Sequence, residues 1–456
     1  MLTRDRASVP TYLPYCTRCC RFVKTKKPKG EHGTLPKCQR HDGVEFSSLS
    51  VTLVIMTIYL DNNATTMIAP EVREAMMPFL REQYFNPSSM YEAARPVRSA
   101  IESARKQIAE DLGAQPSELL FTSCATESVN AAFGGAIRAN PHRKHIVTTA
   151  VEHSAVLEFC KELQRDGYEI SLVGVDRQGN LNLGEFVREL RHDTLLVSVM
   201  HANNETGVIF PVERLARIVK ETNPEILFFC DATQTLTKMP VNVSDNFRNV
   251  DMLAFSGHKF HAPKGVGGLF IRRGTRCKTF MIGGHQESGR RGGTENVPSI
   301  VGMAKAIELA AATHDEDMQR METLRNKLES AIVQSISHIE INGAGAERMP
   351  NTLNVAVHYI EGEGILYQLS ELGICASSGS ACTSGTLEPS HVLTAMDVPF
   401  TAKHGSVRFS LCRYTSEAEI DTVIEEFPKI VARLRHLSPY WDQATNEPRK
   451  DVSAQG

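Results

Sequence analysis

Short runs of apolar residues alternate with longer stretches of mixed polarity between residues 118 and 273. Apolar runs of this length, bounded by polar and turn-forming residues, predict buried strands. They fall at 119–121, 145–148, 195–200, 226–229, 252–255 and 268–271. The stretches between them have the character of helices, and such alternation is typical of an α/β domain with a largely parallel sheet.

The pattern changes after this region. Residues 295–336 predict two long helices with charged outer faces, and the alternating runs 354–357 and 407–410 predict a second, smaller sheet. We therefore expect a large domain at 69–314 and a small domain formed by 56–68 together with 315–437. Residues 438–456 are expected to form a polar tail.

Residues 1–55 differ from the remainder because they hold ten Lys or Arg and four Asp or Glu with little periodicity. They predict an N-terminal extension that is disordered, or a start codon misassigned ahead of Met56. A transit peptide is a further alternative, although the cysteines and glycines fit it poorly. One spacing in the extension could hold zinc, and a basic tail without metal is the plainer interpretation. The four residues concerned are Cys16, Cys19, Cys38 and His41.

Composition narrows the classes of partner. The formal net charge of −3 gives no reason to expect nucleic-acid binding. No apolar run approaches the roughly 18 to 20 residues that a membrane span needs. The eleven cysteines are scattered, odd in number and without a secretory signal, which favours free thiols in a reducing compartment. We expect a cytoplasmic protein that binds neither nucleic acid nor a membrane.

Residues directly after the apolar runs are the first candidates for function, because ligands bind beyond the carboxyl ends of parallel strands. Ser256, Gly257, His258 and Lys259 follow the run 252–255. A lysine at the end of a buried strand can lose solvent, which lowers its pKa and suits it to Schiff-base chemistry. Taken alone, the same residues could form an ordinary surface loop.

Four other strand ends carry chemistry that matches such a lysine. Thr126 is predicted to cap a helix whose N-terminus could bind phosphate, and His153 could stack on a flat ring or carry protons. Asn203 and Asn204 could aim amide donors at a ligand. Asp231 could pair with a protonated pyridine nitrogen, and Gln234 could reach a ring substituent. Each residue also has a simple structural explanation, such as capping or a turn. Together, the five strand ends predict a pyridoxal phosphate site.

The distal half adds two candidates. Cys382 lies in a stretch of glycine, serine and alanine at 376–385, where a thiol can be exposed, and this favours a reactive over a structural cysteine. Arg408 interrupts an apolar strand, and a buried arginine needs a carboxylate partner that a substrate could supply.

Several motifs together resemble the cysteine desulfurases of the NifS/IscS family, and within it the NifS branch of nitrogen-fixation gene clusters. The matching stretches are 59–66, 121–128, 202–207, 256–265, 377–385, 387–391 and 407–410, within a resemblance spanning about 56–437. The resemblance implies the pyridoxal phosphate fold type I, which is aspartate aminotransferase-like. This fold has a large domain with a mostly parallel seven-stranded sheet and a smaller α+β domain.

The resemblance also implies roles for residues around the cofactor ring. Lys259 would hold pyridoxal 5′-phosphate covalently, and Asp231 would pair with the ring nitrogen. Gln234 would bond the ring hydroxyl, while His153 would stack on the ring and share proton transfers. Asn203 is counted with the cofactor ligands and, with Arg408, would grip the substrate carboxylate.

Contacts to the phosphate and the sulfur follow from the same resemblance. The cofactor phosphate would be held by Thr126, Ser256 and His258, and Ala125 and Gly257 are counted with the other cofactor ligands. Ala125 stands where glycine is common in NifS. Thr294 would reach the phosphate of the neighbouring subunit in a homodimer. Cys382 would accept the sulfur, and it is also a candidate for transient iron–sulfur ligation.

The implied function is a cysteine desulfurase, which converts L-cysteine to L-alanine. Sulfur would leave as a persulfide on Cys382 and pass to a scaffold protein for iron–sulfur clusters, with nitrogenase as the destination. A housekeeping desulfurase, a selenocysteine lyase and an aminotransferase of the same fold are alternatives. A non-enzymatic scaffold protein would instead lack cofactor absorbance.

Overall fold

A computed structural model of the protein describes residues 57–378 and 389–449. Cys382 and the zinc spacing in the N-terminal extension lie outside the described residues, so the structure does not bear on either prediction. None of the helices in the described ranges is long and apolar enough to cross a membrane.

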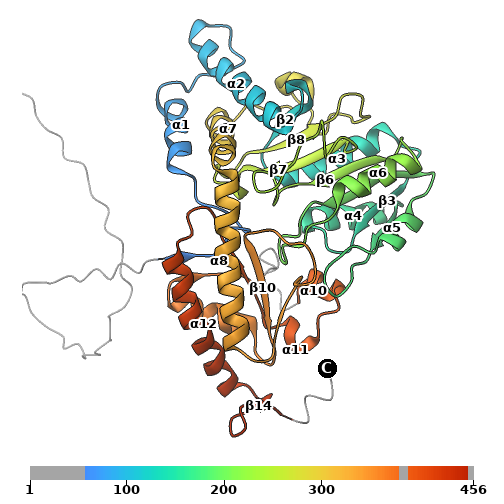
Figure 1. Ribbon diagram of the computed structural model, residues 1–456. Helices are drawn as coiled ribbons and strands as arrows, with labels where there is room; N and C mark the ends of the chain where they lie inside the picture. The colour runs from blue at the N-terminus through green and yellow to red at the C-terminus, as the bar shows by residue number, and fades with distance from the viewer. Residues whose placement is uncertain (1–56, 379–388, 450–456) are drawn as a thin grey trace, which may run out of the picture. The chain divides into compact units, whose positions relative to one another are not determined.

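A seven-stranded sheet forms the centre of residues 119–271 (Figure 1), and its strand order is β2-β8-β7-β6-β5-β3-β4. Its members are β2 (Leu119–Thr122), β3 (His145–Thr149), β4 (Glu169–Val173), β5 (Thr194–Met200), β6 (Leu227–Asp231), β7 (Met252–Ser256) and β8 (Gly267–Ile271). β8 runs antiparallel to both of its neighbours, β2 and β7, whereas the other adjacent pairs of this sheet are parallel. The six predicted runs are therefore confirmed as strands, and the seventh, β4, lies at an edge where its residues are mostly half-buried or exposed.

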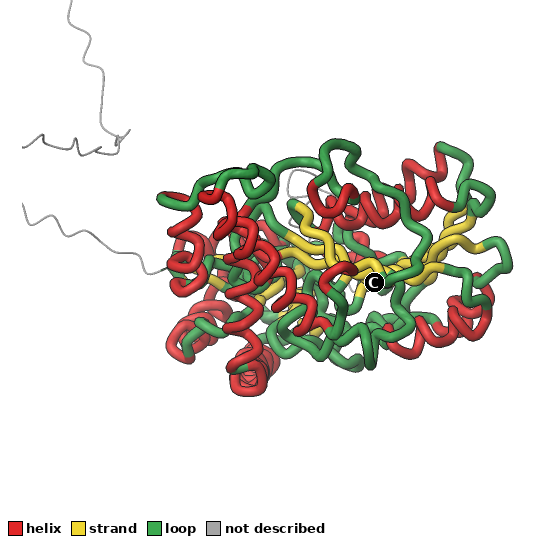
Figure 2. Tube along the Cα trace, turned by 90° about the horizontal axis from the view of Figure 1, so that it is seen from above, coloured by secondary structure: helices red, strands yellow, loops and turns green. Residues whose placement is uncertain are grey.

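Helices cover both faces of this sheet, as the view in Figure 2 shows. On one face lie α3 (Ala125–Ala139) and α4 (Ser154–Arg165). On the other lie α1 (Pro70–Arg81), α2 (Arg95–Leu112), α5 (Leu183–Glu189), α6 (Val212–Thr222) and α7 (Val297–Ala312). Successive residues of one strand serve opposite faces, because side chains alternate along a strand. Phe228 packs with the second group of helices and Phe229 with the first.

A second apolar core surrounds an antiparallel sheet of order β12-β10-β9. This sheet comprises β9 (Ile339–Ile341), β10 (Thr352–Val357) and β12 (Ser406–Ser410), and it packs with α8 (His314–Ser335), α9 (Gly362–Glu371) and α12 (Glu417–Leu437). The short helices α10 (His391–Ala395) and α11 (Phe400–Lys403) lie between β11 and β12 in the chain. The predicted small sheet is confirmed, as are the two long helices, which appear as α7 and α8 (Figure 1).

The first described strand joins this second region. β1 (Ile58–Tyr59) pairs in parallel with β11 (Ile374–Cys375). The backbone N–H of Asn62 then donates to the carbonyl oxygen of Ser410 at 3.2 Å, and its side-chain Nδ2 donates to the same oxygen at 2.8 Å. These bonds direct residues 61–66 across the molecule toward the end of β7.

The expected polar tail is wrong for residues 438–449. They form a hairpin of β13 (Trp441–Asp442) and β14 (Glu447–Pro448). Trp441 is 2% exposed, and the guanidinium of Arg435 lies 4.2 Å from its ring centroid. Trp441, the chain's one tryptophan, therefore packs the hairpin against the end of α12.

Candidate active site

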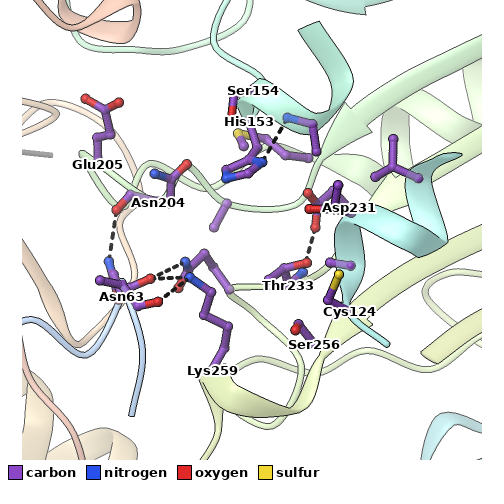
Figure 3. Close-up of a pocket in the computed structure, with 18 of the residues that line it drawn as sticks. Asn63, Cys124, His153, Ser154, Asn204, Glu205, Asp231, Thr233, Ser256 and Lys259 are labelled. Atoms are coloured by element: carbon purple, nitrogen blue, oxygen red, sulfur yellow. Dashed lines mark hydrogen bonds between the residues drawn. The ribbon is translucent and has the colours of Figure 1, made fainter. Parts of the chain in front are cut away.

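A cavity of about 320 Å³ opens where the strands of the large sheet end. Asp231 and Ser256 line it from the last residues of β6 and β7, as Figure 3 shows. Met200 lines it from the last residue of β5. This position is the one expected for a ligand site in a parallel α/β sheet. The predicted site residues that line it are Ala125, Thr126, His153, Asp231, Gln234, Ser256, His258, Lys259 and Arg408.

Lys259 lies in a single 3-10 turn, η3 (Gly257–Lys259), that directly follows β7. Its Nζ donates to the backbone carbonyl oxygens of Asn63 at 2.6 Å and Ala64 at 2.9 Å. The side-chain Nε2 of Gln234 donates to the same Asn63 carbonyl at 3.0 Å. The segment that begins at β1 therefore orients the lysine, as Figure 3 shows, and the glutamine as well.

Asp231 and His153 lie on neighbouring elements of the cavity wall. Asp231 is 7% exposed, and its Oδ1 accepts a hydrogen bond from the backbone N–H of Thr233 at 2.9 Å. His153 is the N-cap of α4, where its Nδ1 accepts from the backbone N–H of Ala155 at 3.1 Å. Because Nδ1 is an acceptor in this contact, a neutral His153 ring carries its proton on Nε2.

The predicted cap at Thr126 is wrong by two residues. Helix α3 begins at Ala125, its N-cap is Cys124, and no side chain among the described residues caps it. An uncapped first turn leaves backbone N–H groups and the positive end of the helix dipole for an anion. A Cβ at Gly267 would lie 2.9 Å from the Cys124 carbonyl carbon, so this glycine lets β8 run close beneath the turn.

Three buried polar atoms of the cavity lining lack a hydrogen-bond partner among the described residues. They are Thr233 Oγ1, Gln234 Oε1 and Ser256 Oγ. Unpaired buried polar atoms are rare in native structures and point to a ligand or ion. With an amine, a buried carboxylate and an uncapped helix start in the same cavity, they fit the aldehyde, pyridine nitrogen, hydroxyl and phosphate of pyridoxal phosphate.

His258 contributes as a neutral ring. Burial and, to a smaller extent, the charges of Lys259 and Lys264 lower its pKa to about 4. Its Nδ1 lies 3.1 Å from Thr65 Oγ1. A neutral imidazole so placed offers hydrogen bonds rather than a positive charge.

Arg408 is 1% exposed and lines the cavity from β12. Its Nη2 lies 2.6 Å from Asp61 Oδ1, and its Nη1 donates to the Asn204 carbonyl at 2.9 Å. Asn203 lies behind the wall, where its Oδ1 accepts from the N–H groups of Glu205 and Thr206 at 2.9 and 3.0 Å. Asn204, rather than Asn203, lines the cavity.

Besides Asn203, two further predicted residues lie outside the cavity lining. Gly257 is packed beneath it, where a Cβ would meet Ala262 and Val266 side-chain carbons at 3.0 Å. Thr294 lines a separate cavity of about 240 Å³ together with Arg291. Among the described residues no group of three or more His, Cys, Asp or Glu could hold a metal ion.

Sequence reasoning missed other residues of the lining. Asn63 and Ala64 act through backbone carbonyls, which carry no side-chain signal. Glu205 is 2% exposed, accepts a 2.5 Å hydrogen bond from Ser390 Oγ, and has a pKa raised by burial. His391 Nε2 lies 2.9 Å from the carbonyl oxygen of Glu152.

Comparison with known proteins agrees with this geometry. Residues 58–423 match the family model described as aminotransferase class-V. The chain therefore belongs to the class-V aminotransferases, which are pyridoxal phosphate enzymes of fold type I. It is 52% identical over 383 residues to a cysteine desulfurase of Trichormus azollae, which covers 84% of this chain and 95% of the relative. Within the class it belongs to the cysteine desulfurases.

Further relatives support the same placement. The cysteine desulfurase NifS of Azotobacter vinelandii is 50% identical over 385 residues, covering 84% of this chain and 95% of that protein. The solved structure of a NifS-like protein matches with a TM-score of 0.78 at 41% identity, over 83% of this chain and all of the other. The expected fold type, cofactor and family are thereby confirmed.

Proposed function

We propose that the protein is a cysteine desulfurase that converts L-cysteine to L-alanine and delivers the sulfur to an acceptor protein. The observation that carries this proposal is the cavity at the strand ends. It brings the Lys259 amine, the Asp231 carboxylate and the unpaired atoms of Thr233, Gln234 and Ser256 into one lining. The 52% identity to a named cysteine desulfurase supports the choice of substrate.

Bound pyridoxal phosphate would withdraw electrons from the substrate and so make its Cα proton acidic. Lys259 would hold the cofactor through Nζ, and Asp231 would keep the ring nitrogen protonated. The first turn of α3, with Ser256 and His258, would hold the phosphate. Once Lys259 is released, its Nζ would take the Cα proton, with His153 as the second group able to move a proton.

Arg408 would bind the substrate carboxylate, because its guanidinium is buried and lines the cavity. Asp61 and the Asn204 carbonyl hold that guanidinium in a fixed orientation. We assign Asn203 to shaping this part of the wall, with any contact to substrate or cofactor made through its neighbour Asn204. The Cys382 sulfur would bond to the substrate sulfur as the substrate's Cβ–S bond breaks, leaving a persulfide.

We further propose a cytoplasmic homodimer in which Thr294 contacts the neighbouring subunit's phosphate. The separate cavity that Thr294 lines is consistent with an exposed role away from its own site.

The acceptor would be a scaffold for iron–sulfur clusters, and Cys382 would ligate such a cluster transiently. The relative named NifS favours nitrogenase as the destination. We also propose that residues 69–314 form the large cofactor-binding domain and that residues 56–68 and 315–437 form the small domain.

The test combines visible absorbance with alanine and sulfide assays on wild type, Cys382→Ala and the control Cys277→Ala. We expect a yellow protein in all three, a spectral change on adding L-cysteine, and product formation only in wild type and the control. A colourless protein would overturn the cofactor assignment. Full activity in Cys382→Ala would instead favour a selenocysteine lyase or an aminotransferase of the same fold.

A further inference from the structure

A second lysine is buried behind the first. Lys238 lies in the segment between β6 and β7 and is 9% exposed. Its Nζ donates to the backbone carbonyl of Gln234 at 3.3 Å, and no carboxylate among the described residues forms an ion pair with it. A buried ammonium without a carboxylate partner is costly, so a residue of this kind usually has a function.

Lys238 and Lys259 line the same small cavity of about 30 Å³ beneath the site. Burial and, to a smaller extent, the charge of Lys259 lower the pKa of Lys238 to about 8. The other titratable or charged groups near Lys238 are Cys412, His258, His261, Asp317 and Arg413. Asp317 does not offset the two lysines directly, because its Oδ2 is 2.9 Å from Arg413 and 2.7 Å from Thr313 Oγ1.

Hydrogen bonds also connect the two lysines. The Gln234 carbonyl accepts from Lys238, and the Gln234 side chain donates to the Asn63 carbonyl at 3.0 Å. That carbonyl in turn accepts from Lys259 Nζ at 2.6 Å. The position of Lys238 is therefore fixed relative to Lys259 by a short path of bonds.

We propose that Lys238 is a positioning residue whose positive charge keeps the amine of Lys259 uncharged, because two cations sharing one buried site repel each other. An uncharged amine is the form that can bond the cofactor aldehyde and accept a proton. The interaction is reciprocal: if the charge of Lys259 disfavours a charge on Lys238, the converse holds equally. This inference rests on the role proposed above for Lys259.

The decisive measurement is competitive labelling of amines with trace acetic anhydride in the full-length, cofactor-free protein at a series of pH values. Mass spectrometry of the peptide that contains Lys259 then gives the pH midpoint of its labelling. A like charge in the same protein site shifts a neighbouring group's pKa by about one unit or more. Lys238→Met should therefore raise the Lys259 midpoint by about one unit, a tenfold loss of uncharged amine near neutral pH.

Matched variants separate charge from packing. Lys238→Gln should raise the midpoint like Lys238→Met, whereas Lys238→Arg keeps the charge and should restore the wild-type midpoint. Lys106→Met, an exposed position on α2, should leave it unchanged. In the holoenzymes, the pH titration of the cofactor's visible absorbance should move in the same direction as the labelling.

These measurements distinguish a failure of the role proposed for Lys238 from a failure of the desulfurase assignment. Unchanged midpoints in both neutral variants, or a raised midpoint in Lys238→Arg, would overturn the role of Lys238 while leaving the desulfurase assignment intact. A wild-type protein that binds no cofactor would fail the proposed function, yet the labelling would still report whether the two lysines interact.

Discussion

Glu152 is a carboxyl group whose charge the fold opposes. It is fully buried, and its Oε1 accepts from Thr149 Oγ1 at 2.8 Å and from the Met200 N–H at 2.9 Å. Its Oε2 has no hydrogen-bond partner among the described residues. Burial raises its pKa from 4.5 to about 8, and the charge of Asp231 acts in the same direction. Replacing it with glutamine mimics the protonated acid.

The raised pKa fixes the sign of the effect on stability. Between about pH 4.5 and 8 the folded protein keeps a proton on Glu152 that the unfolded chain releases. The free energy of unfolding contributed by Glu152 therefore falls as pH rises through this window and is constant above it. The slope is about 1.4 kcal/mol per pH unit in the middle of this window and smaller near its two ends, so the loss between pH 5 and pH 8 is about 3.5 kcal/mol.

The assay is urea denaturation of wild type and Glu152→Gln at several pH values between 5 and 9. The difference in free energy of unfolding should move in favour of the glutamine variant by about 3.5 kcal/mol from pH 5 to pH 8 and then level off. Glu158→Gln, at an exposed position on α4, is the matched control. Its free energy of unfolding should change with pH in parallel with that of wild type. Parallel curves for Glu152→Gln as well would refute the reasoning.

Three further predictions concern stability. Arg105→Met should lower the free energy of unfolding by about 3 to 5 kcal/mol in urea, because it leaves the buried carboxylate of Glu287 without its two-bond partner at 2.7 and 2.8 Å; an unchanged midpoint would contradict this. Gly207→Ala should cost about 1 to 3 kcal/mol in thermal melting, since φ is +78° and the new Cβ would lie 2.8 Å from Thr352 Cβ. Trp441→Ala should cost about 3 to 5 kcal/mol and speed hydrogen exchange at the end of α12, and a wild-type exchange rate there would refute the packing role of the hairpin.

Side-chain patterns predict the parts of the site that depend on side chains. The ends of β6 and β7 could be placed because apolar runs precede Asp231 and Ser256, and both residues line the cavity. The hydroxyl of Thr126 predicts an N-cap at that residue, but the helix begins earlier and its N-cap is Cys124. The hydrophobic pattern does not predict β4, because this strand lies at the edge of the sheet and has no continuous apolar run.

Backbone contributions are hidden from such patterns. The Asn63 carbonyl that bonds Lys259 lies 196 residues away in the chain. Its position depends on tertiary packing of β1 rather than on the identity of nearby residues. The two neighbouring asparagines give a second example. Asn203 and Asn204 have the same side chain, so the sequence cannot indicate that the backbone turns Asn204 rather than Asn203 toward the cavity.

The bond between Asn62 and Ser410 spans 348 residues. At about 5 to 20 residues per second, the ribosome would need roughly 20 to 70 seconds after making Asn62 to supply its partner. Residues 61–66 therefore have no native neighbour in the small sheet during most of synthesis. Because this segment orients Lys259, a nascent chain would complete its cofactor site only near the end of translation, and truncation after β8 should yield a protein unable to retain the cofactor.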